Sequence, residues 1–465
     1  MNVKLRKLGP IEQAEFELGD LTVICGSNNT GKTYATYALY GFLDFWEEAY
    51  VPPVQEKVLE ALYANGKARI SLAHYVERAR KELDRASTEY SQLLSEVFAS
   101  REKLFKDSSF EARLASKPAP DSSYEKSTLR SREKDVFYID HVEPEWLEVA
   151  LLVEKDSSEL IPPKYVLEHR IGAAIKRILY GQLIPRPFIA SAERTGAAIF
   201  RKELDLARNR ALDMLSDKTA KFDPFRLLRE YSTDYALPVK RNVDFTRQIG
   251  ELDKQESALS SRHPDLLRKF SDIIGGTYKV VKDEPYFIPS DKRNVQLTMD
   301  ESSSSVRSLL DVGFYLRHIA RPGELLMIDE PELNLHPENQ RRVARLLATL
   351  VNHGLKVFIT THSDYIVKEF NTLIMLNHHK DGVHSLMRQE GYAEDELLDP
   401  ARVRLYISGK HTRAVDGNQR KRNVFTLTQA HIDPELGIEA ESFDKTIDDM
   451  NRIQDAILYG VESTV

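Results

Sequence analysis

Eight residues, 26–33, read GSNNTGKT and match the spacing G-x-x-x-x-G-K-[ST]. Glycines let such a loop curl so that its backbone N–H groups face a β-phosphate, and the following helix adds its positive dipole end. The spacing therefore predicts a nucleotide site. Lys32 is expected to reach the β- and γ-phosphates, and the Thr33 hydroxyl to ligate Mg²⁺. The predicted phosphate-binding residues are Asn28, Asn29, Thr30, Gly31, Lys32 and Thr33.

A second group of candidate residues follows the apolar run LLMI at 325–328, which ends in Asp329 and Glu330. An apolar strand that ends in two acids predicts that Asp329 holds the Mg²⁺ shell and that Glu330 polarises an attacking water. The acid in the second position favours hydrolysis over binding alone. The alternative is a strand capped by a solvated acidic turn.

Two further motifs have both a functional and a structural interpretation. The strand-like run 357–361 ends in His362, which is positioned to contact a γ-phosphate or the catalytic water, although a lone histidine is usually structural. Four serines at 302–305 precede an apolar-periodic stretch at 309–319. Serines at a helix start are ordinarily N-caps, and the same geometry also forms an anion site. The sequence does not decide between the two for the serines.

The four motifs, in this order, resemble those of AAA-family, ABC-type ATPase heads of the SMC, RecF and OLD families. The closest resemblance is to the OLD-like bacterial ATPases. Their motifs GxNNxGKT, SSSVR, IDEPExxLHP and TTHS correspond to GSNNTGKT, SSSSVRSL, IDEPELNLHP and TTHS in this chain. The resemblance covers residues of about 1–50 and 185–375.

This resemblance implies that two heads dimerise around two ATP molecules with Mg²⁺, or that they form a higher homo-oligomer. Ser303 and Ser304 of one subunit would then face the γ-phosphate bound by Lys32 of the other. The family's strand-plus-arginine segment corresponds to FIASAERTG at 188–196, which makes Arg194 a candidate nucleotide contact. A surface arginine is the alternative for Arg194.

Stand-alone heads of this kind are often the ATPase halves of bacterial anti-phage systems, such as Septu and PARIS, and are paired with a separate nuclease. The resemblance therefore implies an ATPase that controls an effector protein, expected to be a nuclease. Two alternatives are a RecF-like DNA-binding ATPase in DNA repair and an OLD-type enzyme with its own Toprim nuclease domain. Toprim chemistry needs an Asp-x-Asp pair, which this sequence lacks, so intrinsic nuclease activity is not expected.

The elements that must position these residues indicate an α/β fold. The apolar run 21–25 before the glycine-rich loop predicts a buried central strand, and 32–50 a helix. Strand 324–328, helix 337–352, strand 356–359 and helix 363–370 alternate in the last third. We therefore expect a P-loop head with a mixed, mostly parallel sheet flanked by helices.

A helical insertion is expected to interrupt the head. Eight residues in it step by four and three, which is a heptad seam: Leu72, Val76, Ala79, Leu83, Ala86, Tyr90, Leu93 and Val97. The seam fits either one amphipathic helix packed on a globular body or a short coiled-coil arm. The expected domains are 1–50 with the P-loop, 51–184 with the helical insertion, 185–375 as the rest of the head, and 376–465 as an α/β tail.

The composition bears on the protein's location and on the partners it can have. The 465 residues are 42% hydrophobic and 29% charged, which is typical of a soluble globular protein, and we expect no membrane partner. A single cysteine, Cys25, cannot form an internal disulfide, so a cytoplasmic location is expected. With 65 Lys+Arg and 72 Asp+Glu, the net charge is −7. DNA is a possible partner only through a local basic face; Arg413 with the run RKR at 420–422 is a candidate, and a solvated turn is its alternative.

Overall fold

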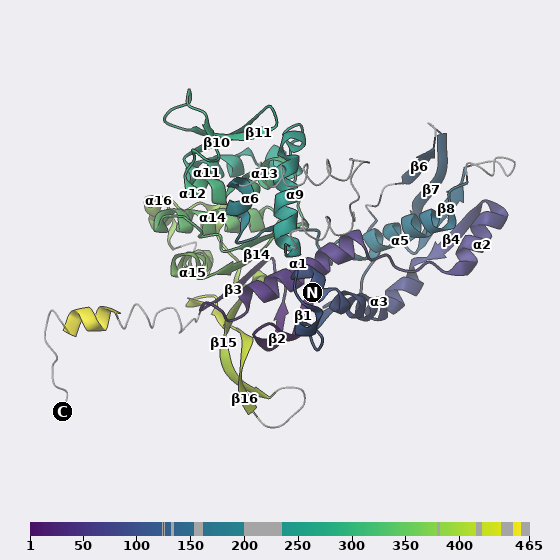
Figure 1. The fold of residues 1–465 in the computed structure, drawn as a ribbon, viewed down its shortest axis with the longest axis horizontal. Helices are drawn as coiled ribbons and strands as arrows, with labels where there is room; N and C mark the ends of the chain where they lie inside the picture. The colour runs from purple at the N-terminus through teal and green to yellow at the C-terminus, as the bar shows by residue number, and fades with distance from the viewer. Residues whose placement is uncertain are drawn as a thin grey trace, which may run out of the picture. The chain divides into compact units, whose positions relative to one another are not determined.

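The computed structural model describes residues 1–122, 124, 126–131, 134–152, 161–199, 235–378, 382–414, 421–438 and 450–456. Arg420 lies outside these residues, and so does the segment 200–234. The sequence from 201 to about 274 predicts a mostly helical stretch, most of whose first half is therefore not described. The chain forms two compact units (Figure 1). The first unit holds residues 1–4, 41–93 and 109–186, and the second holds residues 5–40, 94–108 and 187–465.

A large sheet forms the centre of the second unit. Its neighbouring strands follow the order β1-β2-β16-β15-β3-β14-β13-β9. Their bounds are Asn2–Leu8 (β1), Ile11–Glu17 (β2), Leu21–Gly26 (β3), Pro187–Ala190 (β9), Leu325–Asp329 (β13), Lys356–Thr361 (β14), Val403–Ala414 (β15) and Lys421–Gln429 (β16). The five strands from β15 to β9 are mutually parallel, whereas β16 runs antiparallel to β15. This arrangement confirms the predicted mixed, mostly parallel α/β sheet.

Helices cover this sheet. The helices of the second unit are α4 (Leu94–Val97), α6 (Arg194–Ile199), α9 (Leu237–Leu252), α10 (Ala258–Arg262), α11 (Pro264–Ile274), α12 (Ser304–Ser308), α13 (Leu310–His318), α14 (Pro337–Asn352), α15 (Asp364–His378) and α16 (His384–Glu390). Helix α1 (Lys32–Glu48) starts in this unit. Alternate residues of the central strands, such as Val23, Ile328 and Ile359, pack with α11, α13, α14 and α15 in one core. Short strands β10 (Gly276–Val281), β11 (Glu284–Pro289) and β12 (Leu297–Thr298) form a separate sheet, and β17 (Ile432–Asp433) pairs with β18 (Gly437–Ile438).

The C-terminal part of the chain, expected as an α/β tail from 376, contributes two strands to the large sheet. Strand β15 pairs in parallel with β3 from Val403↔Leu21 to Ser408↔Gly26. Strand β16 in turn pairs with β2 at Phe425↔Ile11. The tail therefore supplies the strand that lies directly beside the strand of the predicted phosphate-binding loop.

The first unit combines the helices expected of the insertion at 51–184 with strands that the sequence analysis did not predict. It holds α2 (Glu56–Asn65), β4 (Lys67–Ser71), α3 (Leu72–Gln92), β5 (Ser109–Arg113), β6 (Ser127–Ser131), β7 (Lys134–Glu143), β8 (Trp146–Leu151) and α5 (Lys164–Tyr180). Strands β4, β8, β7 and β6 pair antiparallel, in this order. In β7 the buried Phe137 and Ile139 alternate with the less buried Tyr138 and Asp140, which is typical of such strands.

Most of the heptad seam is buried within this unit. Six of the eight seam positions lie in α3, and five of these are buried: Leu72, Ala79, Leu83, Ala86 and Tyr90. Tyr90 packs edge-on against Phe110 of β5 at 5.1 Å between ring centroids. Of the two interpretations, the structure has an amphipathic helix packed on a globular body.

Candidate nucleotide-binding site

The predicted catalytic residues follow strands that end at the same edge of the sheet. Cys25 of β3 and Thr361 of β14 are register partners, so the loop 26–33 and His362 leave the sheet at the same level. Strand β13, next to β14, ends at Asp329. The carboxyl edge of parallel strands is where ligands bind in open α/β sheets. The tertiary structure therefore brings three of the four sequence motifs together.

Two glycines of the loop have no substitute. Gly26 and Gly31 adopt φ angles of 133° and 105°, which strain any residue with a Cβ atom. A Cβ on Gly26 would overlap the carbonyl oxygen of Ser408, and one on Gly31 would lie 2.5 Å from Cγ1 of Ile11. Neighbouring strands therefore hold the loop tightly on both sides.

The Lys32 ammonium lies inside the curl of this loop. Its Nζ atom donates to the carbonyl oxygens of Gly26 at 2.9 Å and Ser27 at 2.8 Å. Burial lowers the pKa of Lys32, and the carboxylates of Glu330 and Asp329 oppose that shift. Thr33 is exposed at the start of α1. Phosphate binding by Lys32 and Mg²⁺ binding by Thr33 stay predictions.

His362 connects this lysine to the acid at the end of β13. Its Nδ1 atom lies 3.3 Å from Nζ of Lys32, and its Nε2 atom lies 3.1 Å from Oε1 of Glu330. An ammonium group only donates, so Nδ1 must accept and Nε2–H donates to the carboxylate. This hydrogen bond lowers the pKa of Glu330, which keeps the carboxylate ionised and able to accept a proton.

Asp329 is buried, and its two carboxylate oxygens differ in their hydrogen bonding. Oδ1 accepts a hydrogen bond from Thr360, whereas Oδ2 has no hydrogen-bond partner in the described part of the chain. Burial raises the pKa of Asp329 to about 6, and the negative charges of Glu330 and Glu193 add to the shift. A cation would relieve both the unpaired oxygen and the charge repulsion. The donor set of Asp329 and Thr33 therefore fits Mg²⁺, a hard cation that prefers oxygen ligands.

Glu332 is a functional residue that the sequence reasoning missed. Its Oε1 atom accepts from the backbone N–H of His362 at 2.6 Å and from the Thr361 hydroxyl at 2.9 Å. Burial raises the pKa of Glu332. Glu332 thus fixes the loop that carries His362. An acid two positions after Glu330 was a signal available in the sequence, but nothing local to it indicated its partner thirty residues further along the chain.

Arg194 is buried, with 1% of its surface exposed, which excludes the surface alternative. Its guanidinium donates to four backbone carbonyl oxygens: those of Ser308 at 2.6 Å, Asp329 at 2.7 Å, and Ser191 and Glu330 at 2.8 Å. Burial lowers the pKa of Arg194. The geometry supports a positioning role for the turn at Glu330. The direct nucleotide contact implied by the resemblance stays a prediction.

Ser303 is the N-cap of the short helix α12. Its hydroxyl accepts from the N–H of Val306 at 3.3 Å and lies 2.8 Å from the Ser305 hydroxyl. The cap interpretation is therefore confirmed for Ser303. Ser303 and Ser304 are both exposed, so a contact with a phosphate on a second subunit stays a prediction.

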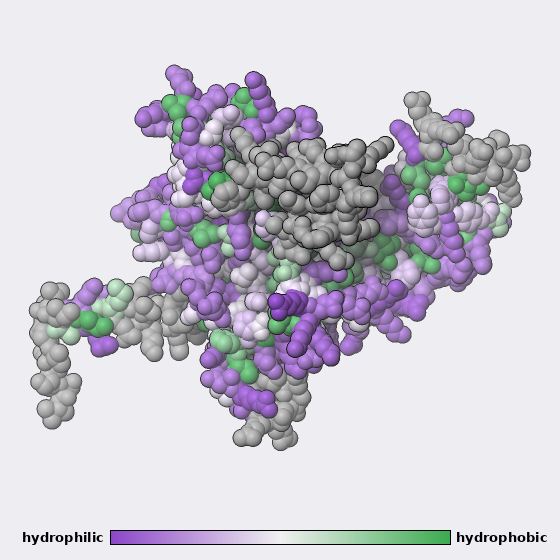
Figure 2. All heavy atoms as spheres, viewed as in Figure 1, coloured by the Kyte–Doolittle hydropathy of each residue, from purple (hydrophilic) through white to green (hydrophobic). Residues whose placement is uncertain are grey.

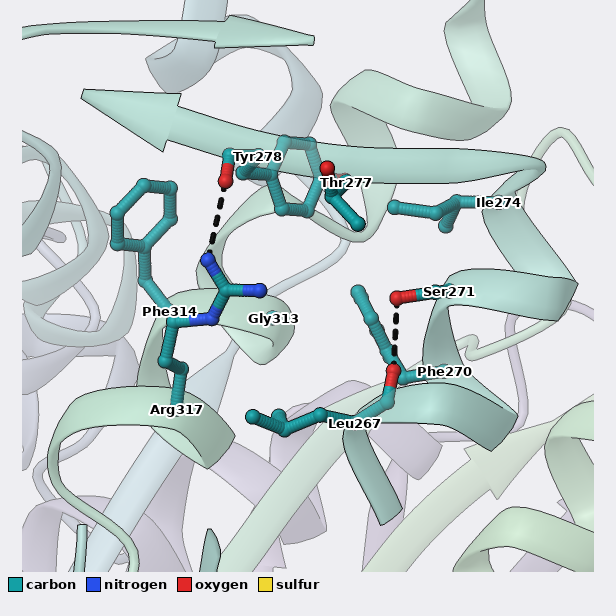
Figure 3. A pocket seen from close by; sticks show the side chains of 9 residues that line it. All are labelled: Leu267, Phe270, Ser271, Ile274, Thr277, Tyr278, Gly313, Phe314 and Arg317. Atoms are coloured by element: carbon teal, nitrogen blue, oxygen red, sulfur yellow. Dashed lines mark hydrogen bonds between the residues drawn. The ribbon is translucent and has the colours of Figure 1, made fainter. Parts of the chain in front are cut away.

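A separate depression lies between α11, β10 and α13 (Figure 3). Its lining is mostly apolar, and Arg317 at its side donates to the Tyr278 carbonyl at 3.0 Å. It shares no residue with the loop 26–33, with Asp329 and Glu330, or with His362. It is therefore distinct from the candidate nucleotide site.

Comparison with known proteins gives one family match. Residues 203–367 match the family model described as "AAA ATPase domain". This span contains Ser303, Ser304, Asp329, Glu330 and His362, and it starts beyond Lys32. The match supports an ATPase. No curated protein matches the chain.

Several solved SMC head structures are similar at low sequence identity. The SMC head domain of Thermotoga maritima is 10% identical, with a TM-score of 0.31, and the match covers 93% of this chain and 98% of that one. An Smc head from Pyrococcus furiosus, bound to the C-terminal domain of ScpA, is 12% identical with a TM-score of 0.31, over 97% and 98% of the two chains. An SmcHead bound to the C-winged helix domain of ScpA is 10% identical with a TM-score of 0.34, over 92% and 96%. Among the helices that the structure describes, none has the length and apolar character to cross a membrane.

Proposed function

We propose that this protein is an ATPase that converts ATP and water to ADP and phosphate. The observation that carries this proposal is the connected series of side chains from Lys32 through His362 to Glu330, at 3.3 and 3.1 Å. The series lies at the carboxyl edge of the sheet, where loop 26–33 begins. A cation for phosphate, a histidine and an ionised carboxylate for the water are the groups that this reaction needs.

Each side chain has a distinct part in the proposed reaction. Lys32 and the backbone N–H groups of residues 28–33 bind the phosphates. The carboxylate of Glu330 accepts a proton from the attacking water, and His362 orients that carboxylate through its Nε2–H. Thr33 and Asp329 would hold Mg²⁺, which when bound neutralises charge on the phosphate oxygens. Arg194 and Glu332 keep Glu330 and His362 in place.

We further propose that two heads dimerise around two ATP molecules, directly or within a larger homo-oligomer. The exposed serines at the start of α12, Ser303 and Ser304, would contact the γ-phosphate held by the partner subunit. Helix α12 is well placed to report on that contact, because the carbonyl of Ser308 at its other end binds Arg194, which binds the carbonyl of Glu330. Dimer closure and hydrolysis would then be coupled.

The motif resemblance supports a role in which these heads control a separate effector, a nuclease, in bacterial anti-phage defence. The test is DNA cleavage by the purified protein alone, with ATP and Mg²⁺ or Mn²⁺, on plasmid and linear duplex. We expect ATP turnover without cleavage. DNA cleavage that persists in Glu330→Gln would overturn the proposal that this chain hydrolyses ATP and that a separate effector cleaves DNA.

The ATPase itself is tested with two variants. Lys32→Ala should abolish nucleotide binding, because the cation for the phosphates is lost. Glu330→Gln should still bind ATP but hydrolyse it about 10²–10⁴-fold more slowly, the usual contribution of a general base. If Lys32→Ala retained its affinity for ATP, the loop 26–33 would not be the phosphate-binding site. If Glu330→Gln hydrolysed ATP at the wild-type rate, Glu330 would not be the general base.

A further inference from the structure

The hairpin of β15 and β16 extends beyond the sheet edge at which the nucleotide site lies. Strand β15 pairs with β3 only as far as Ser408↔Gly26. Beyond this point β15 and β16 pair with each other, from Gly409↔Thr426 to Ala414↔Lys421. Six residues of β15 lie past Ser408, which corresponds to about 20 Å of antiparallel strand. Figure 1 shows the two strands running together away from the helices. We call residues 409–414 and 421–426 the ribbon.

The base of the ribbon contacts the loop 26–33. The hydroxyl of Ser408 donates to the carbonyl oxygen of Thr30 at 3.1 Å. The backbone of Ser408 also lies so close to Gly26 that no side chain fits there. The base of the ribbon therefore has a defined position beside the loop.

The ribbon carries cations that no acid neutralises. Lys410, Lys421 and Arg422 are exposed, and none of them has a carboxylate partner in the described part of the chain. Lys410 lies 5.0 Å from the ring centroid of Phe425, which is the contact it makes across the strands. Figure 2 shows hydrophilic and hydrophobic residues side by side on this hairpin.

The arrangement contrasts with the start of the same strands. There Arg404 pairs with Glu17 at 3.0 Å, and Arg402, just before β15, pairs with Asp20 at 2.8 Å. On the ribbon, by contrast, Lys410, Lys421 and Arg422 have no carboxylate partner among the described residues. A protein of net charge −7 thus gathers cations on one projecting element, which favours a polyanion as its partner.

We propose that the ribbon binds duplex DNA. Lys410 and Lys421 contact backbone phosphates from the face that enters the groove, and Arg422, on the opposite face, contacts a flanking phosphate. A two-stranded antiparallel ribbon has the width that the major groove of B-DNA admits. Thr412 and Asn423, exposed register partners on the ribbon, offer hydrogen-bonding groups toward the groove. The binding is dominated by phosphate contacts, so it has little sequence preference and depends strongly on salt.

The test uses the full chain without nucleotide and a fluorescein-labelled DNA duplex of mixed sequence, followed by anisotropy between about 50 and 200 mM salt. The probing variant is Lys410→Gln/Lys421→Gln/Arg422→Gln. The matched control, Lys279→Gln/Lys292→Gln/Arg293→Gln, removes the same charge from exposed positions on β10 and after β11.

We expect wild type and the control to bind the duplex, and the ribbon variant to bind at least about tenfold more weakly. The slope of log K against log salt concentration should be smaller in magnitude by about 2.7 in the ribbon variant, which is about 0.9 for each of three lost phosphate contacts. The single variant Lys421→Gln should reduce the slope by about 0.9, which guards against a folding defect in the triple variant. Circular dichroism and ATP turnover of the ribbon variant should match those of wild type.

Equal loss of affinity in the control and ribbon variants would overturn the proposal, because it would show non-specific attraction. Absence of duplex binding by the wild-type protein would also overturn the proposal. This holds even if the ribbon variant loses a protein that copurifies with wild type, because the partner would then be a protein. ATP turnover is measured in a separate assay. The DNA-binding result therefore tests the ribbon proposal alone, and the turnover result tests the proposed ATPase.

Discussion

The guanidinium of Arg194 donates to the backbone carbonyl of Glu330 at 2.8 Å, so a buried cation holds the turn that carries the proposed general base. Glu330 has a φ angle of 55°, a left-handed conformation that a residue with a side chain seldom adopts. The bond from Arg194, together with the bond from the Glu330 N–H to the Thr360 carbonyl at 3.1 Å, stabilises this conformation. Because Arg194 also binds the carbonyl of Ser308, helix α12 and the turn share one anchor.

Arg194→Lys should lower both stability and catalysis. A lysine ammonium is a compact donor that cannot span four carbonyl oxygens, and each buried carbonyl left without a partner costs about 1–3 kcal/mol. We expect a lower free energy of unfolding in urea and a kcat for ATP that falls more than ATP affinity does. The exposed Arg262→Lys on α10 is the control. Unchanged kcat in a folded Arg194→Lys protein would contradict the positioning role.

Glu332 offers a test that separates charge from hydrogen bonding. Glu332→Ala leaves the backbone N–H of His362 and the Thr361 hydroxyl without their acceptor, so His362 should lose its orientation and kcat should fall by about 10–100-fold. Glu332→Gln keeps an acceptor oxygen and should retain most of the activity. ATP affinity, measured by titration calorimetry, should change little in either variant. Equal turnover in the alanine and glutamine variants would argue against the bond to His362.

Ser304→Arg tests the proposed contact between subunits. The side chain is exposed, so the larger residue should be tolerated in the monomer, whereas it would fill the space needed by a phosphate of the partner. ATP binding should persist, while light scattering should show no ATP-dependent dimer and turnover should fall at least about tenfold, the size of a lost transition-state contact. Ser261→Arg on α10 is the control. Wild-type turnover in Ser304→Arg would leave the serines as helix caps only.

Asp311 on α13 predicts a pH dependence of stability. Burial raises the pKa of Asp311 to about 7, well above the usual range of an aspartate, and the charge of Arg194 opposes the rise. The folded state therefore keeps a proton that the unfolded chain releases above about pH 4. The stability from this group is full below pH 4 and is lost as the pH rises to about 7, by at most about 1.4 kcal/mol per pH unit.

Asp311→Asn removes this titration. Urea unfolding of the variant should show a smaller fall in stability between about pH 4 and 7 than wild type shows. The variant should also be the more stable protein above pH 7, because position 311 then no longer buries a carboxylate charge. The exposed Asp265→Asn on α11 should leave the wild-type slope unchanged. An identical slope in Asp311→Asn and wild type would mean that Asp311 is ionised throughout this range.

The sequence alone determined the local part of this site. The loop 26–33, the acids at 329 and 330, and His362 each follow an apolar run, and the structure places each of them at the end of a strand. Parallel strands release their following loops at one edge, so a βα alternation is enough to predict that these residues meet. Periodicity and strand-ending polar residues are properties of short windows, which a single sequence contains in full.

Only the tertiary structure decided the long-range partners. Nothing in the run at 403–408 states that it pairs with β3 nearly four hundred residues earlier, because backbone hydrogen bonding is the same for every partner strand. The heptad seam of α3 defines an apolar face but not what covers it. The sequence around Arg194 does not indicate that this residue is buried. Its burial depends on four backbone carbonyls from three separate parts of the chain. Side-chain chemistry is local, whereas the satisfaction of a buried charge and the choice of a neighbouring strand are properties of the whole fold.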